Sequence, residues 1–140
     1  MENDEIIIHT DGGARGNPGP AACSFVVESD DIVIHKGSKY LGKETNNVAE
    51  YQGVILALEW INVNGDKFLS KAIKFFLESE LVVRQLNGIY KIKNKTLQEL
   101  NLKSASLITN SRAEISFGYV PRTKNKIADF LVNKELDKRA

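Results

Sequence analysis

Residues 6–20 constrain the fold of this 140-residue chain more than any other segment. The segment begins with the isoleucines Ile6–Ile8, which are typical of a buried strand. The strand leads into Asp11, and four glycines and two prolines follow in residues 12–20, which predicts that the strand ends at Asp11 and that the chain turns within these nine residues. A carboxylate is therefore expected at the carboxyl end of an apolar strand, where open α/β sheets bind ligands. By itself, Asp11 also fits an ordinary Asp-Gly turn.

The composition, with 42% hydrophobic and 26% charged residues, predicts one globular domain over residues 1–140. The N-terminal segment Met1–Glu5 is acidic, unlike a signal peptide, and no apolar run approaches the ~20 residues that span a bilayer. Cys23 is the single cysteine, which excludes an internal disulfide and argues against structural zinc. We therefore expect a cytoplasmic protein without membrane contact. The net charge of +1 confines any nucleic-acid surface to a local patch.

The hydrophobic pattern predicts four more strands and four helices after the first strand. The strands are expected at residues 21–28, 32–40, 71–77 and 115–119, and the helices at about 47–63, 78–86, 97–110 and from 126 onwards. Residues 43–47 are expected to form a loop that caps the first helix, whose apolar stripe is Val48, Tyr51, Ile55 and Leu58. Leu97, Leu100, Ala105 and Ile108 indicate the third helix.

The element order is βββαβααβα. Strands separated by helices require parallel crossovers, while the first three strands can pair antiparallel. This order predicts an α/β fold with a mixed five-stranded sheet, helices on both faces, and the first and fourth strands as parallel neighbours.

Four acidic residues fall at comparable places in these elements. Asp11 and Glu78 follow apolar strands, whereas Glu50 and Asp129 lie in the first turns of helices. The helix macrodipole alone would favour Glu50 and Asp129 there. Gathering four carboxylates is costly unless cations lie between them, and Mg²⁺ prefers such oxygen ligands. Two such ions can clamp a phosphodiester, so no histidine or cysteine nucleophile is needed.

Four stretches resemble a type 1 ribonuclease H, in the order found in that family. They are TDGGARGNPGP (10–20), TNNVAEY (45–51), ESELVVRQLNG (78–88) and VPRTKNKIAD (120–129). The resemblance implies the ribonuclease H-like fold and endonucleolytic hydrolysis of the RNA strand of RNA/DNA hybrids, giving 5′-phosphate and 3′-hydroxyl ends. It implies two divalent ions, Mg²⁺ or Mn²⁺, held by the catalytic residues Asp11, Glu50, Glu78 and Asp129.

The resemblance also implies where the hybrid binds. Backbone of the glycine-rich segment would approach the RNA minor groove, where 2′-hydroxyls distinguish RNA from DNA, and Thr45 would help to hold a DNA phosphate. The implied substrate-binding residues here are Gly12, Gly13, Arg15, Gly16, Asn17, Thr45, Asn46, Asn47, Ser79 and Glu80. The pair Asn46–Asn47 could instead cap the helix, and both roles can coexist.

Three departures from the family pattern qualify these expectations. Glu78 stands where the family has Asp, so the alternative is a catalytically weakened or inactive hybrid-binding protein of the same fold. Arg122 is the nearest substitute for a histidine that the family often carries before the last helix. Residues 88–95 replace a longer basic protrusion, and Lys91, Lys93 and Lys95 form either a small phosphate-binding patch or a solvated run.

The chain is further expected to lack an N-terminal hybrid-binding module and to be a monomer. A nuclease of the same fold that acts on other nucleic acids is a third hypothesis. His9 is expected to be a hydrogen-bonded core residue rather than a metal ligand, His35 to be exposed, and Trp60 to pack against another element.

Overall fold

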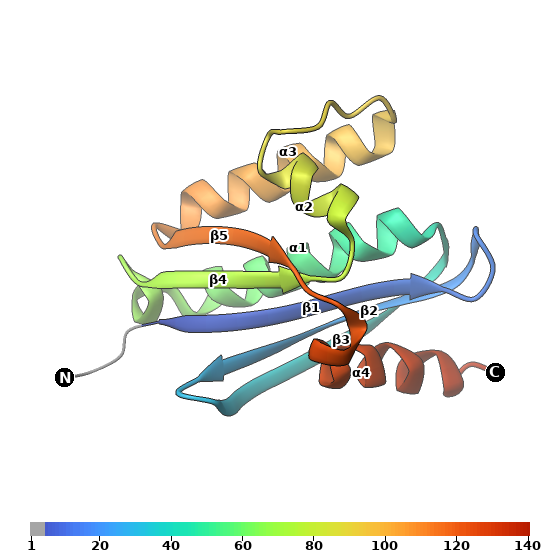
Figure 1. Cartoon of the computed structure of the whole chain (residues 1–140), viewed down its shortest axis with the longest axis horizontal. Coiled ribbons are helices and arrows are strands. Elements are labelled where there is room, and N and C mark those ends of the chain that lie inside the picture. Colours follow the sequence, from blue (N-terminus) through green and yellow to red (C-terminus); the bar gives the residue numbers. More distant parts are fainter. Residues whose placement is uncertain (1–4) are drawn as a thin grey trace.

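The computed structural model describes residues 5–140 and contains a five-stranded sheet in the order β3-β2-β1-β4-β5 (Figure 1). The strands are β1 (Ile6–Ala14), β2 (Gly19–Ser29), β3 (Ile32–Glu44), β4 (Ala72–Leu77) and β5 (Glu114–Tyr119). The pairs β1–β2 and β2–β3 are antiparallel, while β1–β4 and β4–β5 are parallel. The predicted mixed sheet is confirmed, as is the parallel pairing of the first and fourth strands. Residues 1–4 of the acidic N-terminal segment lie outside the described residues.

Four α-helices complete the predicted order. They are α1 (Asn46–Asn64), α2 (Glu80–Leu86), α3 (Lys95–Ser111) and α4 (Lys126–Asp137), with short 3₁₀ turns at Gly65–Phe68 and Arg122–Lys124. None of the helices within residues 5–140 is long and apolar enough to cross a membrane.

The helices cover both faces of the sheet, because alternate residues of β2 contact different helices. Phe25 and Val27 belong to a large apolar cluster with residues of α1, α2 and α3. On the opposite face, Ala22 packs against Val132 and Leu136 of α4 in a much smaller cluster. Figure 1 accordingly shows α4 apart from the other helices. The predicted two-sided coverage is confirmed.

The turn predicted within residues 12–20 is confirmed, but the predicted end of the first strand at Asp11 is wrong. β1 continues to Ala14 and pairs with β2 through Ala14↔Ala21, so the chain turns only in residues 15–18. Glycine permits a turn but does not impose one, and pairing with β2 keeps this stretch extended. On the other side, the pairing of β1 with β4 ends at His9↔Phe76. Asp11 therefore lies beyond the paired region, at the open carboxyl edge of the parallel strands.

Two further predictions need correction. β3 was expected to end near Tyr40 but continues to Glu44, because its pairing with β2 extends to Gly19↔Glu44. Thr45 is the residue that caps α1, and its hydroxyl accepts from the Val48 N–H at 3.2 Å. In α3, Ala105 is exposed and its neighbour Ser104 is buried, so Ala105 does not belong to the inward stripe.

Candidate active site

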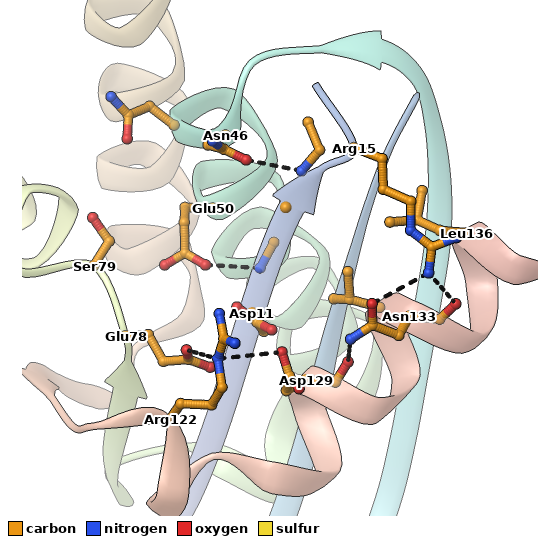
Figure 2. A pocket seen from close by; sticks show the side chains of 15 residues that line it. Asp11, Arg15, Asn46, Glu50, Glu78, Ser79, Arg122, Asp129, Asn133 and Leu136 are labelled. Atoms are coloured by element: carbon orange, nitrogen blue, oxygen red, sulfur yellow. Dashed lines mark hydrogen bonds and ion pairs between the residues drawn. The ribbon is translucent and has the colours of Figure 1, made fainter. Parts of the chain in front are cut away.

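Four elements deliver the four predicted carboxylates to one pocket of about 440 Å³ (Figure 2). Asp11 comes from β1, Glu50 from α1, Glu78 from the end of β4, and Asp129 from the first turn of α4. The remaining lining residues are Gly12, Gly13, Ala14, Arg15, Asn46, Asn47, Ser79, Arg122, Val132, Asn133 and Leu136. The pocket is formed where the open edge of the sheet meets helices from both of its faces.

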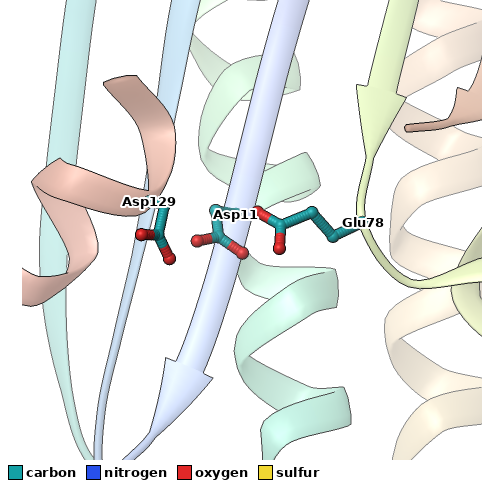
Figure 3. Close-up of side chains that lie close together, drawn as sticks. All are labelled: Asp11, Glu78 and Asp129. Carbon is teal, nitrogen blue, oxygen red and sulfur yellow. The ribbon is translucent and has the colours of Figure 1, made fainter. Parts of the chain in front are cut away.

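Three of these carboxylates converge closely. One carboxylate oxygen from each of Asp11, Glu78 and Asp129 lies within 4.8 Å of the other two, and Figure 3 shows these groups turned toward one another. Glu50 is only 5% exposed, and its Oε1 accepts from the Gly12 N–H at 2.7 Å. Its Oε2 is buried and has no hydrogen-bond partner among the described residues.

The electrostatics of the cluster work against ionisation of its acids. Burial, with the neighbouring Glu50 and Glu78 charges, raises the pKa of Asp11 from 3.8 to about 9. Burial likewise raises the pKa of Glu50 from 4.5 to about 7. A bound cation reverses this effect because it favours the charged form of each neighbouring acid. An all-oxygen donor set with one unpartnered buried oxygen fits a hard divalent cation.

Two further residues approach the carboxylates from the segment before α4. The guanidinium Nε of Arg122 lies 3.5 Å from Glu78 Oε1 and 3.9 Å from Asp129 Oδ1, although its side chain is 77% exposed (Figure 2). Asn125 is buried and donates from Nδ2 to Glu78 Oε2 at 2.9 Å. The acids therefore have one exposed cationic neighbour and one buried amide neighbour.

Comparison with known proteins places this geometry in a family. A family model described as reverse transcriptase-like matches residues 9–135. A ribonuclease H1 isolated from compost by a metagenomic approach is 44% identical over 98% of this chain and 99% of its own, with a TM-score of 0.93. The chain belongs to the type 1 ribonuclease H family.

Other ribonucleases H support this assignment. The ribonuclease H1 of the archaeon Halobacterium salinarum is 35% identical, with a TM-score of 0.87 over 96% of this chain and 98% of that structure. A ribonuclease HI of the same organism is 37% identical over 94% of this chain. The match covers 64% of the length of that protein. A bifunctional protein of Mycobacterium tuberculosis is 36% identical over 97% of this chain. The chain spans 36% of that protein, about a third of its length.

The ribonuclease H fold places part of the predicted substrate-binding set beside the acids. Asn46 Oδ1 accepts from the Ala14 N–H at 2.9 Å, and the Asn46 N–H donates to Asn17 Oδ1 at 2.9 Å. These bonds fix the turn at residues 15–18 against the start of α1. Since Thr45 is the cap, capping as an alternative role for the pair Asn46–Asn47 is wrong.

Two of the predicted substrate-binding residues, Arg15 and Ser79, also make contacts within the protein. Arg15 lines the pocket but pairs with Asp137 at 2.7 Å and reaches Asn133 Oδ1 at 3.3 Å. Ser79 lines the pocket and also caps α2. A second hollow of about 450 Å³ extends from the turn across the start of α1 to the start of α3, and Asn17, Thr45, Asn94 and Thr96 are among its lining residues.

The remaining predicted residues lie away from the acids. Glu80 is outside the pocket lining, and its carboxylate pairs with Arg84 at 2.7 Å. Lys91 and Lys93 are exposed on the segment between α2 and α3, outside both hollows. Gly16 is in the turn, with a positive φ of 101° that glycine adopts readily.

Sequence reasoning missed the role of Asn125, which it placed in a loop. Its signal was its position one residue before the expected last helix, but its side chain makes no cap bond and instead contacts β1 and Glu78. His9 is hydrogen-bonded as predicted, since its Nδ1 lies 2.9 Å from Asn125 Oδ1, and it is not in the group of three acids. It is half-buried rather than a core residue. His35 is exposed, and Trp60 packs on Phe25 and Phe68, as expected.

Proposed function

We propose that this protein is an endoribonuclease that hydrolyses the RNA strand of RNA/DNA hybrids and leaves 5′-phosphate and 3′-hydroxyl ends. The observation that carries the proposal is the convergence of acids from four elements, three of them within 4.8 Å, in one open pocket. A family member 45% identical to this chain, with a TM-score of 0.91, has been solved in complex with an RNA/DNA hybrid. That complex supports the same substrate class for this protein.

The proposed cofactors are two Mg²⁺ or Mn²⁺ ions, held by Asp11, Glu50, Glu78 and Asp129. When bound, such ions activate a water molecule and stabilise the leaving oxygen. The chain contributes the geometry. The Gly12 N–H orients Glu50 through its 2.7 Å bond to Oε1, which leaves the buried Oε2 without a hydrogen bond among the described residues. Arg122 supplies an exposed guanidinium at the pocket mouth, where it can bind a phosphate oxygen.

The turn and the start of α1 are proposed to read the hybrid. Gly12 and Gly13 line the pocket without a side chain, and Asn46 and Asn47 line it as well. Backbone and amide groups can form hydrogen bonds with the 2′-hydroxyls in the minor groove of a hybrid. Duplex DNA has no 2′-hydroxyls. The hollow beside Thr45 is then the proposed place for a phosphate of the DNA strand.

One observation bears on the alternative of a binding protein without turnover. The extra methylene of Glu78 does not remove its carboxylate from the cluster, because the carboxylate still lies within the 4.8 Å group. This favours an active enzyme.

The test is cleavage of four labelled substrates by the purified chain: RNA/DNA hybrid, single-stranded RNA, duplex RNA and duplex DNA. Each is incubated with Mg²⁺, Mn²⁺ or a chelator, with Asp11→Asn as the inactive control. We expect cleavage of the hybrid alone, dependent on metal and lost in Asp11→Asn. Cleavage of all four substrates, or of the hybrid in chelator, would contradict the proposal. Tight hybrid binding without cleavage would instead establish the binding-protein alternative.

A further inference from the structure

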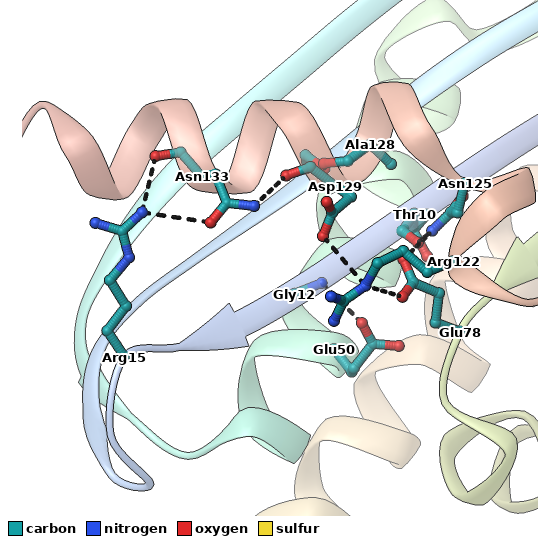
Figure 4. A network of polar contacts seen from close by, with 11 residues as sticks. Thr10, Gly12, Arg15, Glu50, Glu78, Arg122, Asn125, Ala128, Asp129 and Asn133 are labelled. Atoms are coloured by element: carbon teal, nitrogen blue, oxygen red, sulfur yellow. Dashed lines mark hydrogen bonds and ion pairs between the residues drawn. The ribbon is translucent and has the colours of Figure 1, made fainter.

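Asn125 makes three of the four hydrogen bonds that its side-chain amide can form. Figure 4 shows this amide beside Thr10 and Glu78. It is 2% exposed, and its Nδ2 donates to the Thr10 carbonyl oxygen at 3.0 Å and to Glu78 Oε2 at 2.9 Å. Both partners of Nδ2 are acceptors, which fixes the orientation of the amide. Its Oδ1 therefore accepts from the Nδ1–H of His9, 2.9 Å away. The amide is held on three sides.

These contacts connect Asn125 to three of the segments that carry acids. Thr10 precedes Asp11 in β1, and Glu78 receives the second Nδ2 bond directly. The backbone oxygen of Asn125 also accepts from the Asp129 N–H at 3.0 Å. One buried residue thus fixes the relative placement of the three carboxylates that approach within 4.8 Å.

We propose that Asn125 is a positioning residue that holds the carboxylate of Glu78 in place for metal binding. The proposal rests on the proposed function. Glutamate has one more rotatable bond than aspartate, so its carboxylate samples more positions. A hydrogen bond to a charged acceptor from a buried, fixed amide removes that freedom. The other contact of Glu78, Arg122 at 3.5 Å, is too exposed to provide the same restraint.

The first experiment compares Asn125→Ala with a matched control, Asn62→Ala. The Asn62 amide also makes three bonds: Nδ2 donates to the carbonyls of Leu58 and Leu107 at 2.9 and 3.1 Å, and Oδ1 accepts from Asn110 at 2.9 Å. It joins α1 to α3, away from the pocket, so it controls for loss of stability alone. The readouts are the melting temperature, single-turnover hybrid cleavage, and Mg²⁺ affinity by calorimetry without substrate.

We expect Asn125→Ala to lower the cleavage rate by about 30-fold or more, because misplacing a catalytic group by ~1 Å can cost on the order of 10²-fold. Mg²⁺ affinity should fall with it, while hybrid affinity should change less than about threefold, as for a group acting through Glu78. Asn62→Ala should lower the melting temperature similarly but keep rate and Mg²⁺ affinity. If Asn125→Ala does not fold, Asn125→Asp, which keeps the shape and removes both donors, is measured instead.

The second experiment isolates the contact with Glu78 by a double-mutant cycle. Glu78→Asp retracts the carboxylate by about 1.5 Å, one carbon–carbon bond, away from the amide. Replacing Asn125 should therefore cost several-fold less in the Glu78→Asp background than in the parent. Equal costs in both backgrounds, or a parent-like rate and Mg²⁺ affinity for the Asn125 variants, would overturn the proposal. If the parent itself cleaves no hybrid, the proposed function fails, while calorimetry of the same variants still decides the role of Asn125.

Discussion

At Asp11, burial and the charges of Glu50 and Glu78 oppose the ionised form that its proposed role as a metal ligand needs. Glu50 faces it from α1, Glu78 from the end of β4 and Asp129 from α4, while Arg122 is the nearby cation. Its pKa in the folded protein, about 9, lies above its ordinary value of 3.8. The stability that this shift provides is fully present below pH ~4 and is lost as the pH rises through about 9. The pKa of Glu50 is also raised, to about 7, so this residue too lowers the stability of the fold as the pH rises.

We therefore expect the melting temperature of the parent protein in chelator to fall from pH 5 to pH 9. Asp11→Asn cannot ionise, so its melting temperature should fall less and should exceed that of the parent by several degrees at pH 8. Mg²⁺ at pH 8 should raise the melting temperature of the parent more than that of the variant, because it binds the folded parent more tightly. Circular dichroism measures the melting curves of the parent and of the variant, each in chelator and in Mg²⁺. Parallel pH profiles for parent and variant would contradict this account of Asp11.

The residues of the site differ in how far sequence reveals them. Asp11, Glu50, Glu78 and Asp129 each sit at a recognisable point of a strand or helix, and the structure brings all four into one pocket. Asn125 could not be found in this way, because its partners His9 and Thr10 are 116 and 115 positions away. Which way a buried amide turns depends on such contacts, and a local pattern does not contain them.

At the scale of elements, the close approach of β1 and α1 depends on Gly12. A Cβ at this position would lie 2.1 Å from the Ala49 carbonyl oxygen, inside the first turns of α1. Gly13, next to it, has Val132 Cγ1 at 4.0 Å as its nearest neighbour and leaves ordinary room. Gly12→Ala should therefore separate α1 from β1 and displace Glu50.

We expect Gly12→Ala to lower the free energy of unfolding by about 3 kcal/mol or more, since forcing atoms into a packed interior typically costs 1–3 kcal/mol. Gly13→Ala should cost less than about 1 kcal/mol, which is within the range of unstrained changes. Urea denaturation of both variants measures the difference. Equal stabilities would show that α1 can shift without cost.

The segment between α2 and α3 permits a test of the lysine patch. Lys91 and Lys93 lie on this segment, Lys95 is the first residue of α3, and all three are exposed. If they contact phosphates, replacing all three by alanine should weaken hybrid binding and reduce the slope of log K against log salt by roughly 0.7–0.9 per lost contact. Lys67, in the 3₁₀ turn after the far end of α1, is the control and should leave the slope unchanged. Fluorescence anisotropy in Ca²⁺ at several salt concentrations measures the slope. An unchanged slope for the triple variant would make these lysines solvated bystanders.

Element boundaries were predictable where local chemistry decides them. The expected helix at 47–63 and the observed Asn46–Asn64 differ by one residue at each end, because Thr45 and Gly65 cap it. The ends of β1 and β3 were misplaced, because a strand continues for as long as its neighbour pairs with it. Pairing is a long-range property, which glycines and polar residues do not reveal.

At the scale of the molecule, the site depends on two apolar clusters of unequal size. Leu58 and Trp60 of α1 contribute to the large cluster. Leu136 of α4 belongs to the small cluster, which packs α4 against the sheet. Leu136→Ala should therefore release α4 and Asp129 while the large cluster stays intact. Core truncations of this kind cost about 2–5 kcal/mol. We expect this cost to exceed the free energy with which the small cluster holds α4 against the sheet.

In urea, we expect the midpoint for loss of hybrid cleavage in Leu136→Ala to lie below the midpoint for loss of Trp60 fluorescence. Trp60 is the single tryptophan and contacts Phe25 and Phe68, so it reports the large cluster. Leu58→Ala, in the large cluster, should lower both midpoints together. Coincident midpoints in Leu136→Ala would mean that α4 opens only with the whole protein.

The attachment of α4 by so few apolar residues has a consequence for temperature. Turnover is the chemical rate multiplied by the fraction of molecules in which α4 is docked. As warming lowers that fraction, an Arrhenius plot of hybrid cleavage should bend downward while the tryptophan signal is still native. The optimum temperature of the proposed hybrid cleavage is then set by the docking equilibrium of one helix rather than by the melting of the sheet.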